Sequence, residues 1–141
     1  MTMTTNEHYY PITVFYEDTD AAGMVYHANY LKFMERARTT FLRERELKVS
    51  EMVNQYHIQL LVRAANLTFE KPAKLEQTLT VVTKVTKLGR ASVHFEQKIF
   101  VEPHQPDSLV CVGEIVIVCT NLKGKPCAIP EPIVRELKSE N

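Results

Sequence analysis

The order of hydrophobic patterns along the chain predicts an α+β fold with an antiparallel sheet and one long helix. Three observations carry this prediction. An alternating segment at Tyr10–Glu17 predicts a first strand. From Asn29 to about Glu46 the apolar residues repeat at the helical period instead. Four further β patterns follow between Ile58 and Cys119, an order typical of α+β proteins.

The first strand is predicted from the alternation of its side chains. Ile12, Val14 and Tyr16 fall on one side of the segment, and Thr13 and the other intervening residues fall on the other. The segment is also rich in β-branched and aromatic residues, which are enriched in strands.

The long helix is predicted from two contrasting faces. Its apolar face carries Tyr30, Met34, Ala37 and Phe41, and its polar face carries Lys32, Arg36, Thr39 and Arg43. The pattern predicts about five helical turns. A second, short helix is predicted at Val49–Tyr56.

The later strands follow period-two repeats over residues 58–64, 79–85 and 93–101. The last run, Leu109–Cys119, is almost continuously apolar, which predicts a strand buried on both faces at the centre of the sheet. Turn-forming residues at 71–73, 88–90, 103–106 and 123–126 separate the strands. The tail after Pro126 is predicted to be loosely held.

Composition narrows the class of protein. A length of 141 residues, 45% of them apolar, suits a single domain over residues 1–141. Lys plus Arg and Asp plus Glu number 17 each, so no overall charge favours nucleic acid or an anionic membrane. Met1–His8 lacks the pattern of a secretion leader, and no apolar segment is long enough to span a membrane. Cys111, Cys119 and Cys127 form an odd set without a C-x-x-C pair, which argues against disulfides and favours a cytoplasmic protein.

Several kinds of chemistry lack their motifs. The chain has only four glycines and contains no G-x-G-x-x-G or P-loop motif, which argues against nucleotide chemistry. It contains no G-x-S-x-G motif either, and its five histidines lack zinc-ligand spacing. We therefore expect no metal site, and a carboxylate is the credible agent for hydrolysis.

The densest cluster of unusual residues lies between the first strand and the long helix. Residues 16–27 bring Asp18, Asp20, the flexible Gly23 and His27 to the start of a helix. A helix N-terminus favours a developing negative charge, and acyl transfer needs such a site together with a nucleophile or base. From spacing alone, an alternative stays open in which Asp18, Thr19 and Asp20 are only turn and cap residues.

This loop and the helix after it resemble the opening of the 4-hydroxybenzoyl-CoA thioesterase family. The nearest branch is the YbgC-type acyl-CoA thioesterases associated with the Tol–Pal system. The residues that carry the resemblance are Tyr16-Glu17-Asp18-Thr19-Asp20-Ala21-Ala22-Gly23-Met24-Val25-Tyr26-His27-Ala28-Asn29-Tyr30 and Phe33-Met34-Glu35-Arg36-Ala37-Arg38. The resemblance covers nearly the whole chain. It implies a hotdog fold, in which an antiparallel sheet wraps around one long central helix, and a homodimer or homotetramer.

The resemblance also implies catalytic residues. The family's catalytic carboxylate falls on Asp20, and the YbgC-type tyrosine and histidine fall on Tyr16 and His27. The backbone N–H at position 27 matches the family's oxyanion site. Asp18 is expected instead to bond to the loop backbone, and Asn29 stands where a helix N-cap would be useful.

Substrate-binding residues are expected in two segments. Gly23, Val25 and Tyr26 lie beside the carboxylate, and Arg90 and Ser92 lie in a turn that matches where family members bind coenzyme A phosphates. The expected substrate is an acyl-CoA or an acylated carrier protein. Coenzyme A would be part of the substrate, so no separate cofactor is expected.

Two other functions stay open at this stage. A hotdog hydratase or dehydratase also uses an acid and a histidine near the helix start, although its usual motif spaces them differently. A non-catalytic protein could instead hold acyl carriers or lipid-synthesis enzymes in a complex. Release of free thiol from an acyl-CoA would separate hydrolysis from both alternatives.

Overall fold

The computed structural model describes residues 7–138. The expectation that Met1–His8 is not a leader therefore falls mostly outside the described residues, and so does the end of the C-terminal tail at 139–141. Within the described range, no helix is both long and apolar enough to cross a membrane.

The described elements follow the predicted order of strand, helices and further strands. They are β1 (His8–Thr13), α1 (Asn29–Arg43), α2 (Val49–Tyr56), β2 (Ile58–Phe69), β3 (Thr78–Leu88), β4 (Ser92–Val101), β5 (Leu109–Asn121) and α3 (Glu131–Lys138). Short 3-10 helices lie at Tyr16–Asp18 and Pro106–Ser108. The predicted α+β class and the short helix α2 are confirmed.

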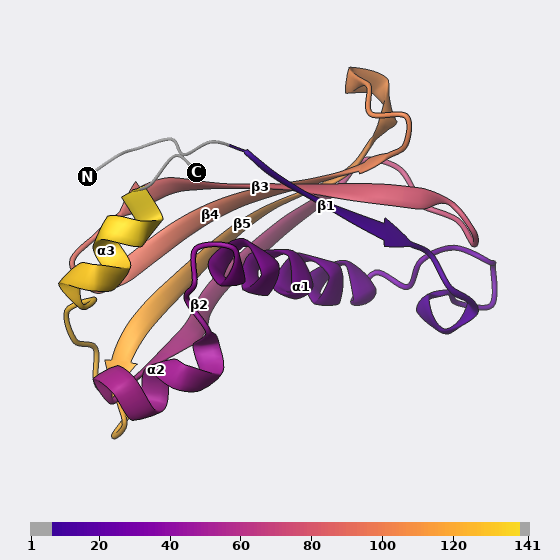
Figure 1. The fold of residues 1–141 in the computed structure, drawn as a ribbon. Helices are drawn as coiled ribbons and strands as arrows, with labels where there is room; N and C mark the ends of the chain where they lie inside the picture. Colours follow the sequence, from indigo (N-terminus) through magenta and orange to yellow (C-terminus); the bar gives the residue numbers. More distant parts are fainter. Residues whose placement is uncertain (1–6, 139–141) are drawn as a thin grey trace.

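The strands form one antiparallel sheet in the order β1-β3-β4-β5-β2. Figure 1 shows that the sheet curves over α1, which lies along its concave side. This arrangement places the two ends of α1 at opposite ends of the sheet. The start of α1 lies near the β1–α1 loop, and its C-terminal half lies toward α2 and α3.

The apolar face of α1 forms the centre of the core. Met34, Ala37 and Phe41 are completely buried and Tyr30 is nearly so, as the helical pattern predicts. Phe33 joins them, also completely buried. Burial of this face against the sheet supplies most of the stability of such a helix, since a helix of 15 residues is marginal alone.

The long helix is shorter than its pattern predicts. It ends at Arg43 rather than near Glu46. Glu46 adopts a left-handed conformation with φ of 60°, and the Leu47 N–H donates to the Leu42 carbonyl at 2.9 Å. Such a bond closes a helix C-terminus, so α1 stops one turn early.

The first strand is also shorter than predicted, ending at Thr13 instead of Glu17. The Asp18 carboxylate accepts a hydrogen bond from the Phe15 N–H at 2.9 Å, and Tyr16–Asp18 forms a turn of 3-10 helix. A local bond from side chain to backbone competes here with strand pairing. The alternating pattern therefore extends past the true end of the strand.

The predicted central position of the last strand is wrong. β4 is the middle strand, and β5 lies between β4 and the edge strand β2. On the face of β5 toward α1, Cys111, Gly113, Ile115 and Ile117 are all buried. On the other face Val112 and Val116 are half-buried and Glu114 is exposed. The apolar run therefore arises from one buried face and one partly covered face.

The C-terminal tail is not loosely held within the described range, which corrects the prediction. Ile129, Ile133 and Leu137 are all buried, with Ile133 and Leu137 on one face of α3. The Ile129 N–H also donates to the Arg90 carbonyl at 2.9 Å. The spacing of four residues between these apolar side chains was a helical signal.

The packing of α3 gives a testable prediction. Ile133→Ala should lower the free energy of unfolding by about 2–4 kcal/mol, because it removes a side chain that is only 1% exposed from the contact between α3 and the core. The exposed Arg135 on the same helix provides the control, and Arg135→Ala should change stability by less than about 0.5 kcal/mol. Urea denaturation of both variants measures the difference, and equal stabilities would show that α3 does not contribute to the core.

Candidate active site

The β1–α1 loop is held in a defined shape by its own backbone. The Asp20 N–H donates to the Met24 carbonyl at 2.8 Å, and the Gly23 N–H donates to the Asp20 carbonyl at 3.0 Å. Gly23 has a φ of 78°, a conformation that glycine adopts without strain. Val25, which is buried, anchors the end of the turn by donating to the Ala73 carbonyl at 2.9 Å.

The two aspartates of the loop have different environments. Asp18 is only 8% exposed and uses both carboxylate oxygens. One oxygen accepts the Phe15 N–H, and the other accepts the Asn29 side-chain amide at 2.9 Å. The expectation that Asp18 bonds to the loop backbone is confirmed. Asp18 thus ties the loop to the first residue of α1.

Asp20, in contrast, is exposed. Its Oδ1 accepts the Ala22 N–H at 2.9 Å and the Met24 N–H at 3.4 Å, whereas Oδ2 has no hydrogen-bond partner within residues 7–138. One oxygen is therefore held by the loop and the other is open to a ligand. Asp20 can act as a base or nucleophile because its carboxylate is oriented without being fully engaged.

The charge of Asp20 affects the pKa of the nearby Tyr30. Burial is the main cause that raises the pKa of Tyr30, and the charges of Cys111 and Asp20 raise it further, while the bond from the Ala73 N–H works in the opposite direction. The Tyr30 hydroxyl accepts that N–H at 3.2 Å. The start of α1, the Asp20 loop and the segment after β2 therefore meet at one place.

The N-terminus of α1 is not capped by a side chain. The N-cap residue is Ala28, and the first turn contains no acidic residue. The expectation that Asn29 caps the helix is wrong, because Asn29 is the first helical residue and its amide is used by Asp18. The Asn29 N–H donates to the Tyr26 carbonyl at 2.8 Å, but no side chain caps this helix end, which suits an anion or a developing oxyanion.

His27 lies just before this helix start and is exposed. Its ring packs beside Tyr26, with centroids 4.6 Å apart, and near Phe69, with centroids 6.4 Å apart. Within residues 7–138 its backbone N–H has no hydrogen-bond partner. The His27 ring thus lies among aromatic side chains, and its N–H is free of a partner within residues 7–138.

Tyr16 is less closely integrated. Its side chain is 83% exposed and makes no side-chain hydrogen bond within the described residues. Its carbonyl instead accepts the Thr19 N–H and hydroxyl at 3.0 and 2.7 Å. Tyr26 is 48% exposed beside His27. The loop therefore presents aromatic side chains to its surroundings.

Arg90 and Ser92 lie at the opposite end of the sheet from Asp20. Thr13, at the end of β1, pairs with Thr78 at the start of β3, whereas the Arg90 turn follows the other end of β3. The 11 residues of β3 span roughly 35 Å. Figure 1 shows the same separation between the β1–α1 loop and α3. One chain therefore does not bring its own Asp20 and Arg90 together.

Comparison with known proteins identifies the family. The family model described as the thioesterase-like superfamily matches residues 14–137. The chain belongs to this superfamily. It is 36% identical over 137 residues to the acyl-CoA thioester hydrolase YbgC of Escherichia coli O6:H1, covering 96% of this chain and 99% of the relative. It is 33% identical to the acyl-CoA thioesterase YbgC of Haemophilus influenzae, covering 93% and 94%.

Solved structures of thioesterases share the fold. A probable thioesterase from Bartonella henselae has 31% identity and a TM-score of 0.80, over 88% of this chain and 99% of that one. A 1,4-dihydroxy-2-naphthoyl-CoA thioesterase from Synechocystis has a TM-score of 0.86 at 22% identity, over 94% and 96%. The YbgC-type resemblance, the hotdog fold and the enzyme class of thioester hydrolase are thus confirmed.

Two aromatic residues of this thioesterase were missed by sequence reasoning as part of the site. Phe69, at the end of β2, is 50% exposed and packs near His27 and Tyr30. Tyr30 was assigned only to the helix core. The alternation of side chains along β2 predicts on which face of the strand Phe69 lies. No local pattern shows that this end of β2 meets the start of α1.

The cysteine thiols are poor candidates for a nucleophile in this site. Burial raises the pKa of Cys111 and Cys119 to about 12, and the bond to Cys127 contributes for Cys119. Both lie in β5 and Cys127 follows it, as expected for two strand residues and one loop thiol. Residues 7–138 contain no group of three acidic, His or Cys side chains placed to hold a metal.

The Asp18–Asn29 bond gives a testable prediction. A double-mutant cycle of Asp18→Ala and Asn29→Ala should show a coupling energy of about 0.5–3 kcal/mol, because the buried bond joins these two side chains. Denaturation of the single and double variants measures it. Strictly additive effects would mean that the contact does not hold the loop to α1.

Proposed function

We propose that this thioesterase hydrolyses an acyl-CoA thioester to a free acid and a thiol. One observation carries the proposal: the exposed Asp20 carboxylate lies in the loop that leads into the uncapped N-terminus of α1. The acyl-CoA substrate is supported by the names of the YbgC relatives. An acylated carrier protein has the same thioester chemistry and is the second substrate to test.

Asp20 supplies the attack in this mechanism. Either its carboxylate adds to the thioester carbonyl, or it removes a proton from a water molecule that adds there. The C–S bond then breaks and the sulfur takes a proton. In the nucleophilic route, water afterwards releases the acid from Asp20. The open Oδ2 suits both routes, since it has no partner within residues 7–138.

The start of α1 stabilises the negative charge that develops on the carbonyl oxygen. The His27 N–H is the proposed donor, because it is unpaired within the described chain and precedes the helix. The His27 ring orients water or protonates the leaving sulfur. Tyr16 completes the proposed catalytic set, and Gly23, Val25 and Tyr26 shape the site around the thioester.

The edge strand β2 supports a site shared between two copies. β2 has 12 residues, and Leu61 and Val62 on it are 43% and 55% exposed. Long open edges invite pairing, and two-fold symmetric dimers are the commonest solution. Antiparallel pairing of two β2 strands would place the Phe69 end of one beside the Ile58 end of the other.

That pairing would also complete the binding site. Ile58 lies opposite Asn121 in the sheet and Ser92 lies opposite Val118, so the Arg90 turn is at the Ile58 end. Phe69 and His27 mark the other end. Asp20 of one copy would then face Arg90 and Ser92 of the second, which we propose bind the phosphates of coenzyme A. The assembly is a homodimer or a homotetramer built from it.

The proposed setting of the enzyme is the cytoplasm. Its three cysteines are free thiols, which suits a reducing compartment. Coenzyme A enters as part of the substrate, so the proposal needs no separate cofactor.

The carboxylate mechanism gives a direct prediction. Asp20→Asn should lower turnover by about 100-fold or more while the fold persists, because it removes the base and nucleophile but keeps the shape. Glu17→Gln, which neutralises an exposed carboxylate in the same loop, should stay within about twofold of the parent. Thiol release from a panel of acyl-CoAs is the assay. Near-normal hydrolysis by Asp20→Asn would end the mechanism.

The shared site gives a separate prediction. Asp20→Asn and Arg90→Ala should each be impaired alone, but their co-expression should restore activity to about a quarter of the parent level. Half of the dimers are then mixed, and one of the two sites in each mixed dimer is intact. The formation of mixed dimers is verified by mass. If they show no restored activity, Asp20 and Arg90 either serve separate functions or act within the same chain.

A further inference from the structure

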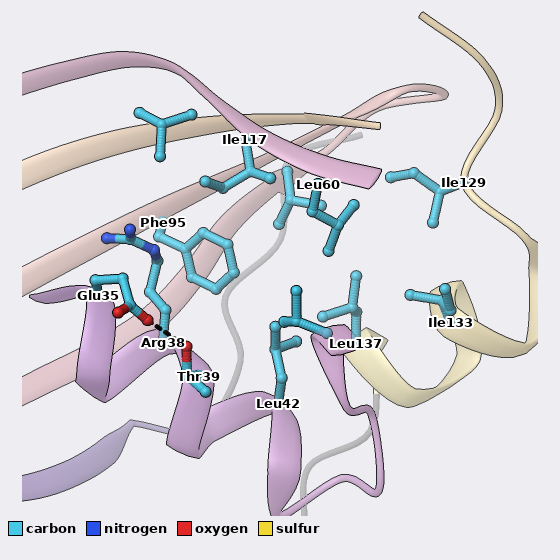
Figure 2. Close-up of a pocket in the computed structure, with 13 residues that line it drawn as sticks. Glu35, Arg38, Thr39, Leu42, Leu60, Phe95, Ile117, Ile129, Ile133 and Leu137 are labelled. Atoms are coloured by element: carbon cyan, nitrogen blue, oxygen red, sulfur yellow. Dashed lines mark hydrogen bonds between the residues drawn. The ribbon is translucent and has the colours of Figure 1, made fainter. Parts of the chain in front are cut away.

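An apolar cavity of about 270 Å³ lies between α1, α3 and the sheet, away from the β1–α1 loop. Figure 2 shows side chains converging on it from all three layers. Its main walls are Leu42, Leu60, Phe95, Ile117, Ile133 and Leu137. These side chains offer no hydrogen bonds, so the interior suits a hydrocarbon rather than a polar or charged group.

The polar groups at the mouth of the cavity have partners within the protein. The Thr39 hydroxyl donates to the Glu35 carboxylate at 2.5 Å, and the Arg38 Nη1 donates to the Gln97 Oε1 at 2.8 Å. Gln97 is itself fully buried and donates to the Met34 carbonyl. The mouth can therefore admit an apolar chain without breaking these bonds.

A surface groove leads from the mouth toward the start of α1. Four apolar residues, Leu31, Val62, Ala65 and Ile115, line it together with the charged Lys32, Glu35, Arg36 and Arg38. Val62, Glu35 and Arg38 also line the cavity. A bulge between Val62 and Ala64 keeps Val62 and Ala65 on the same face of β2. That face continues to Phe69, which packs near His27. The groove and this face of β2 thus lead from the cavity toward the proposed site of thioester cleavage.

We infer that this cavity holds the distal end of a long, linear acyl chain whose thioester lies at Asp20, so the preferred substrates are long-chain aliphatic thioesters. The inference rests on the proposed hydrolysis and names its substrate class. The C-terminal helix α3 is then the end wall of the acyl site, through Ile133 and Leu137.

The dimensions set the chain length. Along the helix axis, Glu35 lies about 9 Å and Leu42 about 20 Å from Asn29. With C–C bonds of about 1.5 Å in a zigzag, a chain needs roughly eight carbons to reach the mouth and roughly sixteen to pass the cavity walls. A cavity of 270 Å³ has room for on the order of nine groups the size of water, which matches the second half of such a chain.

The test fills the cavity and leaves the catalytic loop unchanged. Leu60→Trp places an indole in the cavity, and Val116→Trp, beside the cavity-lining Ile117 but on the opposite face of β5, is the control. We expect Leu60→Trp to lower kcat/KM for palmitoyl-CoA by about tenfold or more and to keep butyryl-CoA within about twofold, because only the long chain reaches the cavity. Val116→Trp should keep the parent ratio between the two substrates.

Two outcomes would overturn the inference while hydrolysis itself stands. One is a ratio of palmitoyl-CoA to butyryl-CoA turnover that is the same in both variants, and the other is an equal loss for both substrates in Leu60→Trp.

If the parent protein hydrolyses neither substrate, the proposed reaction is wrong. A binding measurement then tests separately whether the cavity holds the acyl chain. Calorimetry with palmitoyl-CoA should then show weaker binding to Leu60→Trp than to Val116→Trp. Equal affinities would exclude the cavity as the chain site.

Discussion

The close packing of α1 against the concave side of the sheet determines where every other feature of the molecule lies. A side chain at Gly113 on β5 would place its Cβ 2.7 Å from the Met34 sulfur, so the helix approaches this strand where a glycine leaves room. The buried Gln97 on β4 donates to the Met34 carbonyl and to the Thr83 hydroxyl, both at 2.9 Å. Apolar contact and buried hydrogen bonds thus hold α1 in one position.

The two ends of α1 then have different chemistry. At its N-terminus the helix lacks a side-chain cap, and the loop before it presents an exposed carboxylate. Toward its C-terminus, Leu42 faces α3 across an apolar cavity. This arrangement suits a molecule that has a polar reactive group at one end and a long apolar chain at the other. The same packing that stabilises the fold therefore separates the proposed site of reaction from the proposed site for the acyl chain.

Two carboxylates of the same loop, Asp18 and Asp20, differ in how deeply they are buried. Asp18 accepts bonds from the Phe15 N–H and the Asn29 amide and is almost completely buried. Asp20 keeps one oxygen open and is exposed. Buried carboxylates need such partners to offset the loss of hydration. The paired aspartate holds the loop in shape, and the open one has a free oxygen for the proposed chemistry.

Much of the fold could be predicted from local patterns because the helix and strand periods are properties of neighbouring residues. The face of α1 with Met34 and Phe41, the helix α2 and the antiparallel strands were all predicted in this way. The errors had two origins, a hydrogen bond from the Asp18 side chain to the nearby backbone and, elsewhere, packing between segments distant in sequence. Asp18 ended β1 early, strand order placed β4 rather than β5 in the centre, and α3 was fixed by packing against the core.

The sequence by itself determined the α+β class, the family through the motif at 16–30, and the candidate carboxylate Asp20. Only the tertiary structure decided that Phe69 adjoins His27, that Arg90 lies at the far end of the sheet, and that Ile133 and Leu137 close a cavity. These facts depend on strand order and helix packing, which join residues distant in sequence. No local pattern of side chains encodes such distances.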